Sequence, residues 1–198
     1  MKMTDVPNFV FSSVLLGVGL AMDAFSVSLA NGLREPGMGK ARMGAIAGVF
    51  GGFQALMPLA GWFCVHTIAQ TFAAVQPWIP WIALILLAYI GGKMLIEGLR
   101  SGDGEEPPPA VGLGGLLLQG VATSIDALSV GFTIADYTFS MALGAALIIA
   151  AVTFLICLAG LRLGKTFGTK LSRGASILGG VILIAIGLRT FLSGVGIF

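Results

Sequence analysis

The chain carries one six-residue pattern twice, each time inside a long apolar stretch. Residues 22–27 read Met22-Asp23-Ala24-Phe25-Ser26-Val27, and residues 125–130 read Ile125-Asp126-Ala127-Leu128-Ser129-Val130, at an offset of 103 residues. Each copy places an aspartate where a membrane-spanning helix normally carries no charge, at a cost of about 2.5–3.5 kcal/mol on insertion scales. Two matched charges of this kind indicate a buried, repeated site for something positively charged.

The composition places the chain among integral membrane proteins. Its 198 residues are 57% hydrophobic and 10% charged, whereas a soluble domain carries about 25% charged residues. The net charge of +2 and the lack of a basic run argue against nucleic-acid binding. Cys64 and Cys157 both lie in apolar stretches, so we interpret them as buried thiols rather than as a disulfide or a metal-binding pair.

The apolar runs predict an all-α membrane protein with six transmembrane helices. A helix needs about 20 apolar residues to cross the hydrocarbon core, and Pro58 is expected to disturb the second of the six. Residues 100–112 form a polar, proline-rich linker between two three-helix halves, 1–99 and 113–198. The predicted spans are residues 9–31, 43–67, 78–98, 113–135, 141–161 and 175–194.

Basic residues in the connections predict the orientation of these helices. Only Lys2 lies on one side, whereas the other side carries Arg34, Lys40, Arg42, Arg100, Arg162, Lys165, Lys170 and Arg173. By the positive-inside rule the basic side faces the cytoplasm, so both termini are expected to face away from it.

The two halves correspond at further positions. Gly17-Val18 matches Gly120-Val121 at the same offset as the aspartate motif, and Leu59-Ala60-Gly61 matches Leu158-Ala159-Gly160. Because each half has an odd number of predicted helices, the halves must lie in opposite orientations. This is an inverted-topology repeat, an arrangement of secondary transporters that bind their substrate near the midplane.

The repeated motif supplies hard oxygen ligands. Asp23 and Ser26 are three residues apart and share one helix face, as do Asp126 and Ser129. Oppositely directed helices would place the carboxylates on both sides of the midplane, about 10 Å apart along the membrane normal if the helices are straight. Such oxygens suit Mg²⁺, Ca²⁺ or Mn²⁺ better than Zn²⁺ or Cu⁺. In the alternative interpretation, the aspartates are structural and pair with the serines or with basic residues, Lys93 and Arg189.

Other intramembrane polar residues are weaker candidates. Gln54 could supply a neutral oxygen, although an interhelical hydrogen bond is the usual role of such a residue, as it is for Asn31, Thr123, Ser124 and Thr153. Glu97 follows Lys93 by four residues, which favours an interfacial ion pair over an exit ligand or a proton acceptor.

These segments resemble the MntP family of bacterial manganese exporters, within the LysE-type transporter superfamily. The resemblance covers essentially the whole chain and is carried by residues 19–28, 50–62, 91–98 and 122–131. It implies six helices, a bacterial inner-membrane location, export of Mn²⁺, and functional acidic residues at Asp23, Asp126 and Glu97. Some relatives carry a glutamate where this chain has Gln54, so the coupling here could differ.

The expected function is therefore Mn²⁺ efflux by alternating access, with proton exchange as a candidate driving reaction. Asp23 and Asp126 would bind the ion, helped by Ser26, Ser129, Gln54 and Glu97. The chain has no Walker-type motif, and it is expected to be no enzyme and to need no cofactor, since Mn²⁺ is its substrate. The expected partners are Mn²⁺ and the lipid bilayer, without nucleic acid, and a homo-oligomer is left open. The alternatives are export of another divalent cation or of a cationic amino acid, a non-transporting scaffold, and an intramembrane enzyme.

Overall fold

The computed structural model describes residues 6–75, 79–100, 111–171 and 173–194, and within them every regular element is a helix. The predicted all-α class is confirmed for these residues. The helices are α1 (Val6–Arg34), α2 (Lys40–Val75), α3 (Ile79–Arg100), α4 (Leu113–Ser124), α5 (Ala127–Thr133), α6 (Phe139–Leu171) and α7 (Arg173–Gly194). Residues 101–110 of the expected linker, and Lys2, lie outside the described residues.

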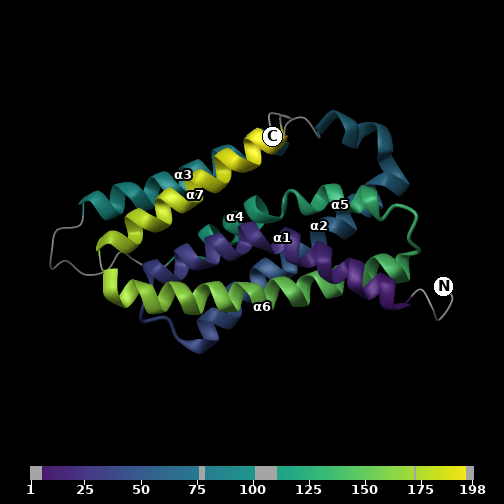
Figure 1. Cartoon of the computed structure of the whole chain (residues 1–198). Coiled ribbons are helices and arrows are strands. Elements are labelled where there is room, and N and C mark those ends of the chain that lie inside the picture. The colour runs from purple at the N-terminus through teal and green to yellow at the C-terminus, as the bar shows by residue number, and fades with distance from the viewer. Residues whose placement is uncertain (1–5, 76–78, 101–110, 172, 195–198) are drawn as a thin grey trace.

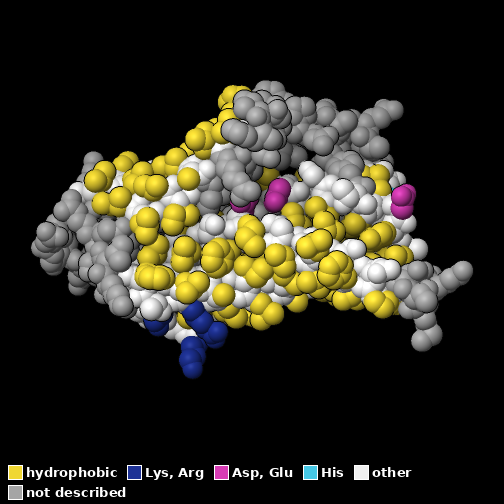
Figure 2. Space-filling model, viewed as in Figure 1, with side chains coloured by type: hydrophobic (Ala, Val, Ile, Leu, Met, Phe, Trp, Pro, Cys, Tyr) yellow, Lys and Arg dark blue, Asp and Glu magenta, His cyan; other side chains and the backbone are white. Residues whose placement is uncertain are grey.

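Three of the described helices are long and apolar enough to cross a membrane. They cover Val6–Arg34, Lys40–His66 and Phe139–Phe167, and Leu113–Ser124 is a shorter apolar helix. Their outward faces carry large exposed hydrophobic side chains, such as Phe11 at 68% and Leu155 at 65% exposure. Figure 2 shows hydrophobic side chains over most of one face of the molecule. Apolar outer surfaces of this kind suit contact with lipid rather than with water.

The long helices lie roughly along one common direction; α1 and α6 run parallel to each other, whereas α3 and α7 run antiparallel (Figure 1). α1 packs along α6, α3 packs along α7, and α2 contacts both α5 and α6. Glycines make these contacts close. A Cβ atom on Gly32 would collide with the backbone of α6, and a Cβ atom on Gly131 would collide with the backbone of α2. Small residues are the usual means of close helix contact in membranes, where lipid is as apolar as the helix surface.

The fourth predicted span is broken at the aspartate motif. α4 ends at Ser124 and α5 begins at Ala127, so Ile125 and Asp126 form a turn between two helices. Two side chains just before the break bond to carbonyl oxygens of their own helix: Ser124 Oγ donates to Gly120 O at 2.6 Å, and Thr123 Oγ1 donates to Gln119 O at 2.9 Å. Hydroxyls that bond to backbone carbonyls in this way bend and weaken helices.

Pro58 does not interrupt its helix. The sequence predicts a disturbance at Pro58 without deciding between a break and a kink, and α2 continues from Lys40 to Val75 with Pro58 inside it. A proline removes one N–H donor, and membrane helices tolerate this where neighbouring groups compensate for the lost hydrogen bond. Pro58 is buried. The helix break therefore lies in the other half of the chain, beside Asp126.

Candidate ion-binding site

The structure brings the two aspartates of the repeated motif near each other. Asp23 lies in α1 and Asp126 lies in the turn between α4 and α5; both are partly buried. Asp23 is close enough to act on Asp126 electrostatically. Asp126 Oδ1 also accepts a hydrogen bond of 2.9 Å from the backbone N–H of Ala127, which orients the carboxylate. Two neighbouring carboxylates in an apolar setting repel each other unless a cation or a proton lies between them.

Figure 2 shows acidic side chains in a recess near the middle of the visible face, with hydrophobic side chains around them. Basic side chains gather instead toward one end of the molecule in the same view. In the same view an acidic side chain also lies toward the end opposite the basic ones.

Ser26 and Ser129 each follow the aspartate of their motif by three residues, and both are partly buried. Ser26 Oγ donates to Met22 O at 3.0 Å, so its hydroxyl proton points along α1. Its oxygen keeps lone pairs that can face a cation. The backbone N–H of Ser129 donates to Asp126 O at 3.0 Å and closes the turn that holds Asp126.

Gln54 joins the two halves of the site. Its side chain is fully buried, and Nε2 donates to Leu20 O at 3.2 Å and to Thr123 O at 3.1 Å. These two acceptors lie three residues before Asp23 and Asp126. Oε1 of Gln54 has no hydrogen-bond partner among the described residues. Leaving such a buried acceptor unpaired costs about 1–3 kcal/mol, so its position calls for a ligand or a water molecule.

Two further predicted residues cannot be placed at this site. Glu97 lies on α3, but its side chain is outside the described residues, as is that of Arg189 on α7. Lys93 is exposed on α3. The described residues contain no group of three or more His, Cys, Asp or Glu side chains that could hold a metal ion. A cation at this site would therefore need hydroxyl, amide or carbonyl oxygens in addition to the two carboxylates.

The sequence interpretation anticipated interhelical hydrogen bonds for Gln54 and Asn31 but did not identify their partners. Gln119 of α4 was not singled out, yet it is fully buried and exchanges two hydrogen bonds with Asn31 of α1. The sequence feature that could have identified Gln119 is its position within an apolar run, seven residues before Asp126. The backbone carbonyls of Leu20 and Thr123 carry no sequence signal, because their role depends on the rotamer of Gln54.

Comparison with known proteins identifies the family of the chain. Residues 37–191 match the model of the family Mntp, whose description is "Putative manganese efflux pump". The chain belongs to the MntP family. The matched region includes Gln54, Glu97, Asp126 and Ser129, and it begins after Asp23 and Ser26. The resemblance inferred from the motifs is confirmed.

Curated MntP relatives are similar over nearly their whole length. "Putative manganese efflux pump MntP" of Sorangium cellulosum is 42% identical over 92% of this chain and 96% of its own. "Putative manganese efflux pump MntP 2" of Clostridium botulinum (strain Hall) is 39% identical over 91% of this chain and 93% of its own. The MntP of Clostridium perfringens (strain 13) is 38% identical over 95% and 96%, respectively. No solved structure matches the chain significantly. Family membership and the apolar helices make this a multi-pass membrane protein.

Proposed function

We propose that this chain is a manganese transporter that exports Mn²⁺ from the bacterial cytoplasm across the inner membrane. Membership of the MntP family supports the substrate and the direction of transport. The observation that carries the proposal is the approach of Asp23 to Asp126, from two copies of one motif, inside an apolar helical protein. An efflux pump needs a buried cation site, and two carboxylates from equivalent copies of one motif suit such a site better than they suit an enzyme or a scaffold.

Asp23 and Asp126 are the proposed charged ligands of the ion. Ser26, Ser129 and the free Oε1 of Gln54 are the proposed neutral ligands, and this set consists of hard oxygens that suit Mn²⁺. Glu97 on α3 is proposed as a residue on the exit path. The carboxylates would exchange protons for the metal ion, since metal binding requires their deprotonated form.

The helices are proposed to form two inverted repeats, 1–99 and 113–198, with six spans in which α4 and α5 together make the fourth. Corresponding contacts support this arrangement. A side chain at Gly61 would collide with Leu128 O, and a side chain at Gly160 would lie against Phe25 O. Leu128 and Phe25 hold the same place in the two copies of the motif.

A second pair of contacts also relates equivalent positions of the two repeats. A Cβ atom on Gly17 would lie 3.1 Å from Val152 Cβ, and one on Gly120 would collide with the ring of Phe53. Gly17 corresponds to Gly120 in the aligned motifs. Gln54 adds to this pattern, because its Nε2 donates to Leu20 and Thr123, which stand at the offset of 103 residues that relates the two motifs.

Alternating access is the proposed mechanism. The two repeats would rock against each other around the aspartates and expose the ion first to the cytoplasm and then to the outside. The basic end of the molecule is proposed to face the cytoplasm, with both termini on the opposite side. The turn at Ile125–Asp126 gives one repeat a discontinuous helix beside the site, which is a common feature of such transporters.

Flux through the purified protein tests this function. We expect the protein in liposomes to move Mn²⁺ down its gradient, and we expect excess lysine to leave that flux unchanged. A panel of Mn²⁺, Mg²⁺, Ca²⁺, Co²⁺ and Zn²⁺ would rank the ions, and preference for another ion would assign a different divalent substrate. Inhibition by lysine would favour a cationic amino acid, and no flux of any substrate would favour a scaffold.

A further inference from the structure

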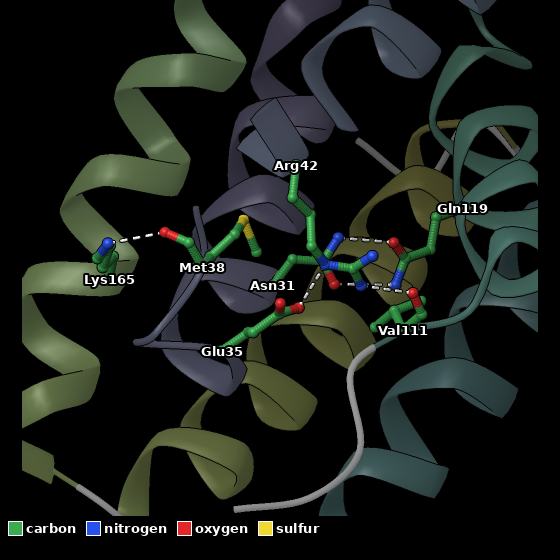
Figure 3. Close-up of polar contacts among 7 residues, drawn as sticks. All are labelled: Asn31, Glu35, Met38, Arg42, Val111, Gln119 and Lys165. Atoms are coloured by element: carbon green, nitrogen blue, oxygen red, sulfur yellow. Dashed lines mark hydrogen bonds and ion pairs between the residues drawn. The ribbon is translucent and has the colours of Figure 1, made fainter. Parts of the chain in front are cut away.

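A buried pair of amides joins α1 to α4 away from the aspartates. Asn31 Nδ2 donates to Gln119 Oε1 at 2.7 Å, and Gln119 Nε2 donates to Asn31 Oδ1 at 3.2 Å (Figure 3). Asn31 is 2% exposed and Gln119 is 0% exposed. Each amide thus satisfies one donor and one acceptor of the other, and this pair of bonds forms a direct polar link between the two halves of the chain.

The amide pair lies between the aspartates and one end of the molecule. Asn31 follows Asp23 by eight residues in α1, and Gln119 precedes Asp126 by seven residues along α4. At a rise of 1.5 Å per residue, each amide is about 10–12 Å from the aspartate of its own segment. Spacings of seven and eight residues keep the amides on the helix faces that carry the aspartates. The pair therefore closes the interface between α1 and α4 on one side of the ion site.

Further polar contacts hold the same end closed. Arg42 Nε pairs with Glu35 Oε2 at 2.8 Å, and Arg42 Nη2 donates to Val111 O at 2.7 Å. Lys165 Nζ of α6 donates to Met38 O at 2.7 Å (Figure 3). The connection between α1 and α2 is thereby bonded to the residues that precede α4 and to α6. This is the end that carries the basic connections.

The two positions that correspond to the amide pair in the repeat are apolar. At the offset of 103 residues, Gln119 corresponds to Leu16 and Asn31 corresponds to Ile134. Leu16 packs against the buried apolar residues around Leu20, and Ile134 is 2% exposed. The repeated fold itself therefore does not require the amide pair. At the opposite end the two halves are joined by a different contact, in which Trp62 Nε1 donates to Tyr137 O at 3.0 Å. When two buried polar groups separate, water can replace the hydrogen bonds that they lose. Apolar side chains form no such bonds with water when their contact opens.

We infer that the pair Asn31–Gln119 is the gate that closes the ion path on the cytoplasmic side. The inference rests on the proposed transport function, and it assigns to this structure a conformation closed at its basic end. When the gate opens, the two amide oxygens become free acceptors on the path to Asp23 and Asp126. Amide oxygens are hard ligands, so they can receive Mn²⁺ as it leaves water.

Reversible cross-linking tests the gate through transport. Cysteines replace both amides (Asn31→Cys with Gln119→Cys) in a Cys64→Ala, Cys157→Ala background, and a short bis-methanethiosulfonate reagent joins them. We expect Mn²⁺ flux in liposomes to fall at least tenfold after cross-linking and to return after reduction. Each single-cysteine variant, treated in the same way, should keep its flux. Unchanged flux through protein shown by mass to be cross-linked would overturn the inference.

Thiol labelling tests the gate without transport. Thr123→Cys places a thiol between Gln119 and Asp126, and a membrane-impermeant maleimide is added from the cytoplasmic side. Removing both amides together (Asn31→Ala with Gln119→Ala) should speed labelling at least tenfold, whereas Leu16→Ala with Ile134→Ala should leave its rate unchanged. Equal rates in both variants would mean that the amides only join two helices. Because this readout needs no flux, it can support or refute the gate even if the proposed transport of Mn²⁺ fails.

Discussion

Gln54 of α2 donates a hydrogen bond from Nε2 to the carbonyl oxygen of Thr123 at 3.1 Å, three residues before Asp126. The same nitrogen reaches Leu20 O, three residues before Asp23. One buried side chain thus links the backbone segments that lead into both aspartates. Its remaining oxygen is buried without a partner among the described residues. This combination fits a residue that positions the two carboxylates and also offers an oxygen to the ion.

Replacing Gln54 by leucine removes both functions while it keeps an apolar side chain of similar size. We expect Gln54→Leu to raise the Mn²⁺ concentration at half-maximal flux about tenfold or more, since a neutral ligand and two backbone bonds are lost. Concentration-dependent flux in liposomes measures this. Ser13→Ala is the control, because Ser13 is also a buried polar residue but precedes Asp23 by ten residues in α1. An equal loss in both variants would show that general packing, and not the site, is responsible.

The close glycine contacts predict a sharp difference among glycine variants. Gly61→Ala and Gly160→Ala push a methyl group against carbonyl oxygens of α5 and α1. We expect each to lower the free energy of unfolding by about 1–3 kcal/mol, the usual cost of overpacking. Gly48→Ala and Gly52→Ala are the controls, because a Cβ atom at either position meets nothing within 4 Å. Thermal unfolding in detergent compares the four variants, and equal midpoints would contradict the close packing.

The amide pair predicts energetic coupling between two positions far apart in sequence. Asn31→Ala alone leaves the buried amide of Gln119 without its partner, which costs about 1–3 kcal/mol. Gln119→Ala has the same effect in reverse, and the double variant should cost less than the sum of both. Unfolding midpoints of the four proteins complete a double-mutant cycle. Strict additivity of the two losses in stability would contradict the pairing.

The ion pair between Glu35 and Arg42 should matter less for stability. Glu35→Gln breaks this partly exposed pair and should lower the free energy of unfolding by less than about 1 kcal/mol.

The proposed orientation predicts which loops react from which side. Gly37 lies exposed between α1 and α2, and Thr138 lies exposed just before α6. In a cysteine-free background, Gly37→Cys should react with an impermeant maleimide only in inverted vesicles, and Thr138→Cys only in intact cells. The positive-inside rule gives this expectation. The reverse labelling pattern would mean that the protein has the opposite orientation in the membrane and that the gate lies at the outer face.

Much of the helical pattern could be predicted from the sequence because it depends on the length of apolar runs. Each predicted span contains described helix, although α2 extends to Val75 and α6 to Leu171, beyond the predicted ends at 67 and 161. Helices can continue past the apolar core into polar sequence, which run length does not detect. The approach of Asp23 to Asp126 followed from the repeated motif, since opposed copies of one segment bring equivalent residues toward the midplane.

The helix break and the interhelical bonds could not be predicted in the same way. Pro58 is the stronger helix breaker by propensity, yet α2 continues through it, and the break falls at Ile125–Asp126. Beside that break, the Thr123 and Ser124 hydroxyls bond to carbonyls of their own helix, which depends on their rotamers. The link between Asn31 and Gln119 depends on the register between α1 and α4. Neither rotamers nor register can be read from hydrophobicity.

The most direct measurement of the proposed site compares three aspartate-to-asparagine variants by Mn²⁺ flux in liposomes. Asp23→Asn and Asp126→Asn each remove one charge from the site, and Asp136→Asn makes the same change at an exposed residue after α5. The predicted result is a loss of flux of at least a hundredfold in the first two variants and near-normal flux in the third. Wild-type flux in Asp23→Asn and Asp126→Asn, with both proteins folded, would contradict the proposal that these carboxylates carry the ion.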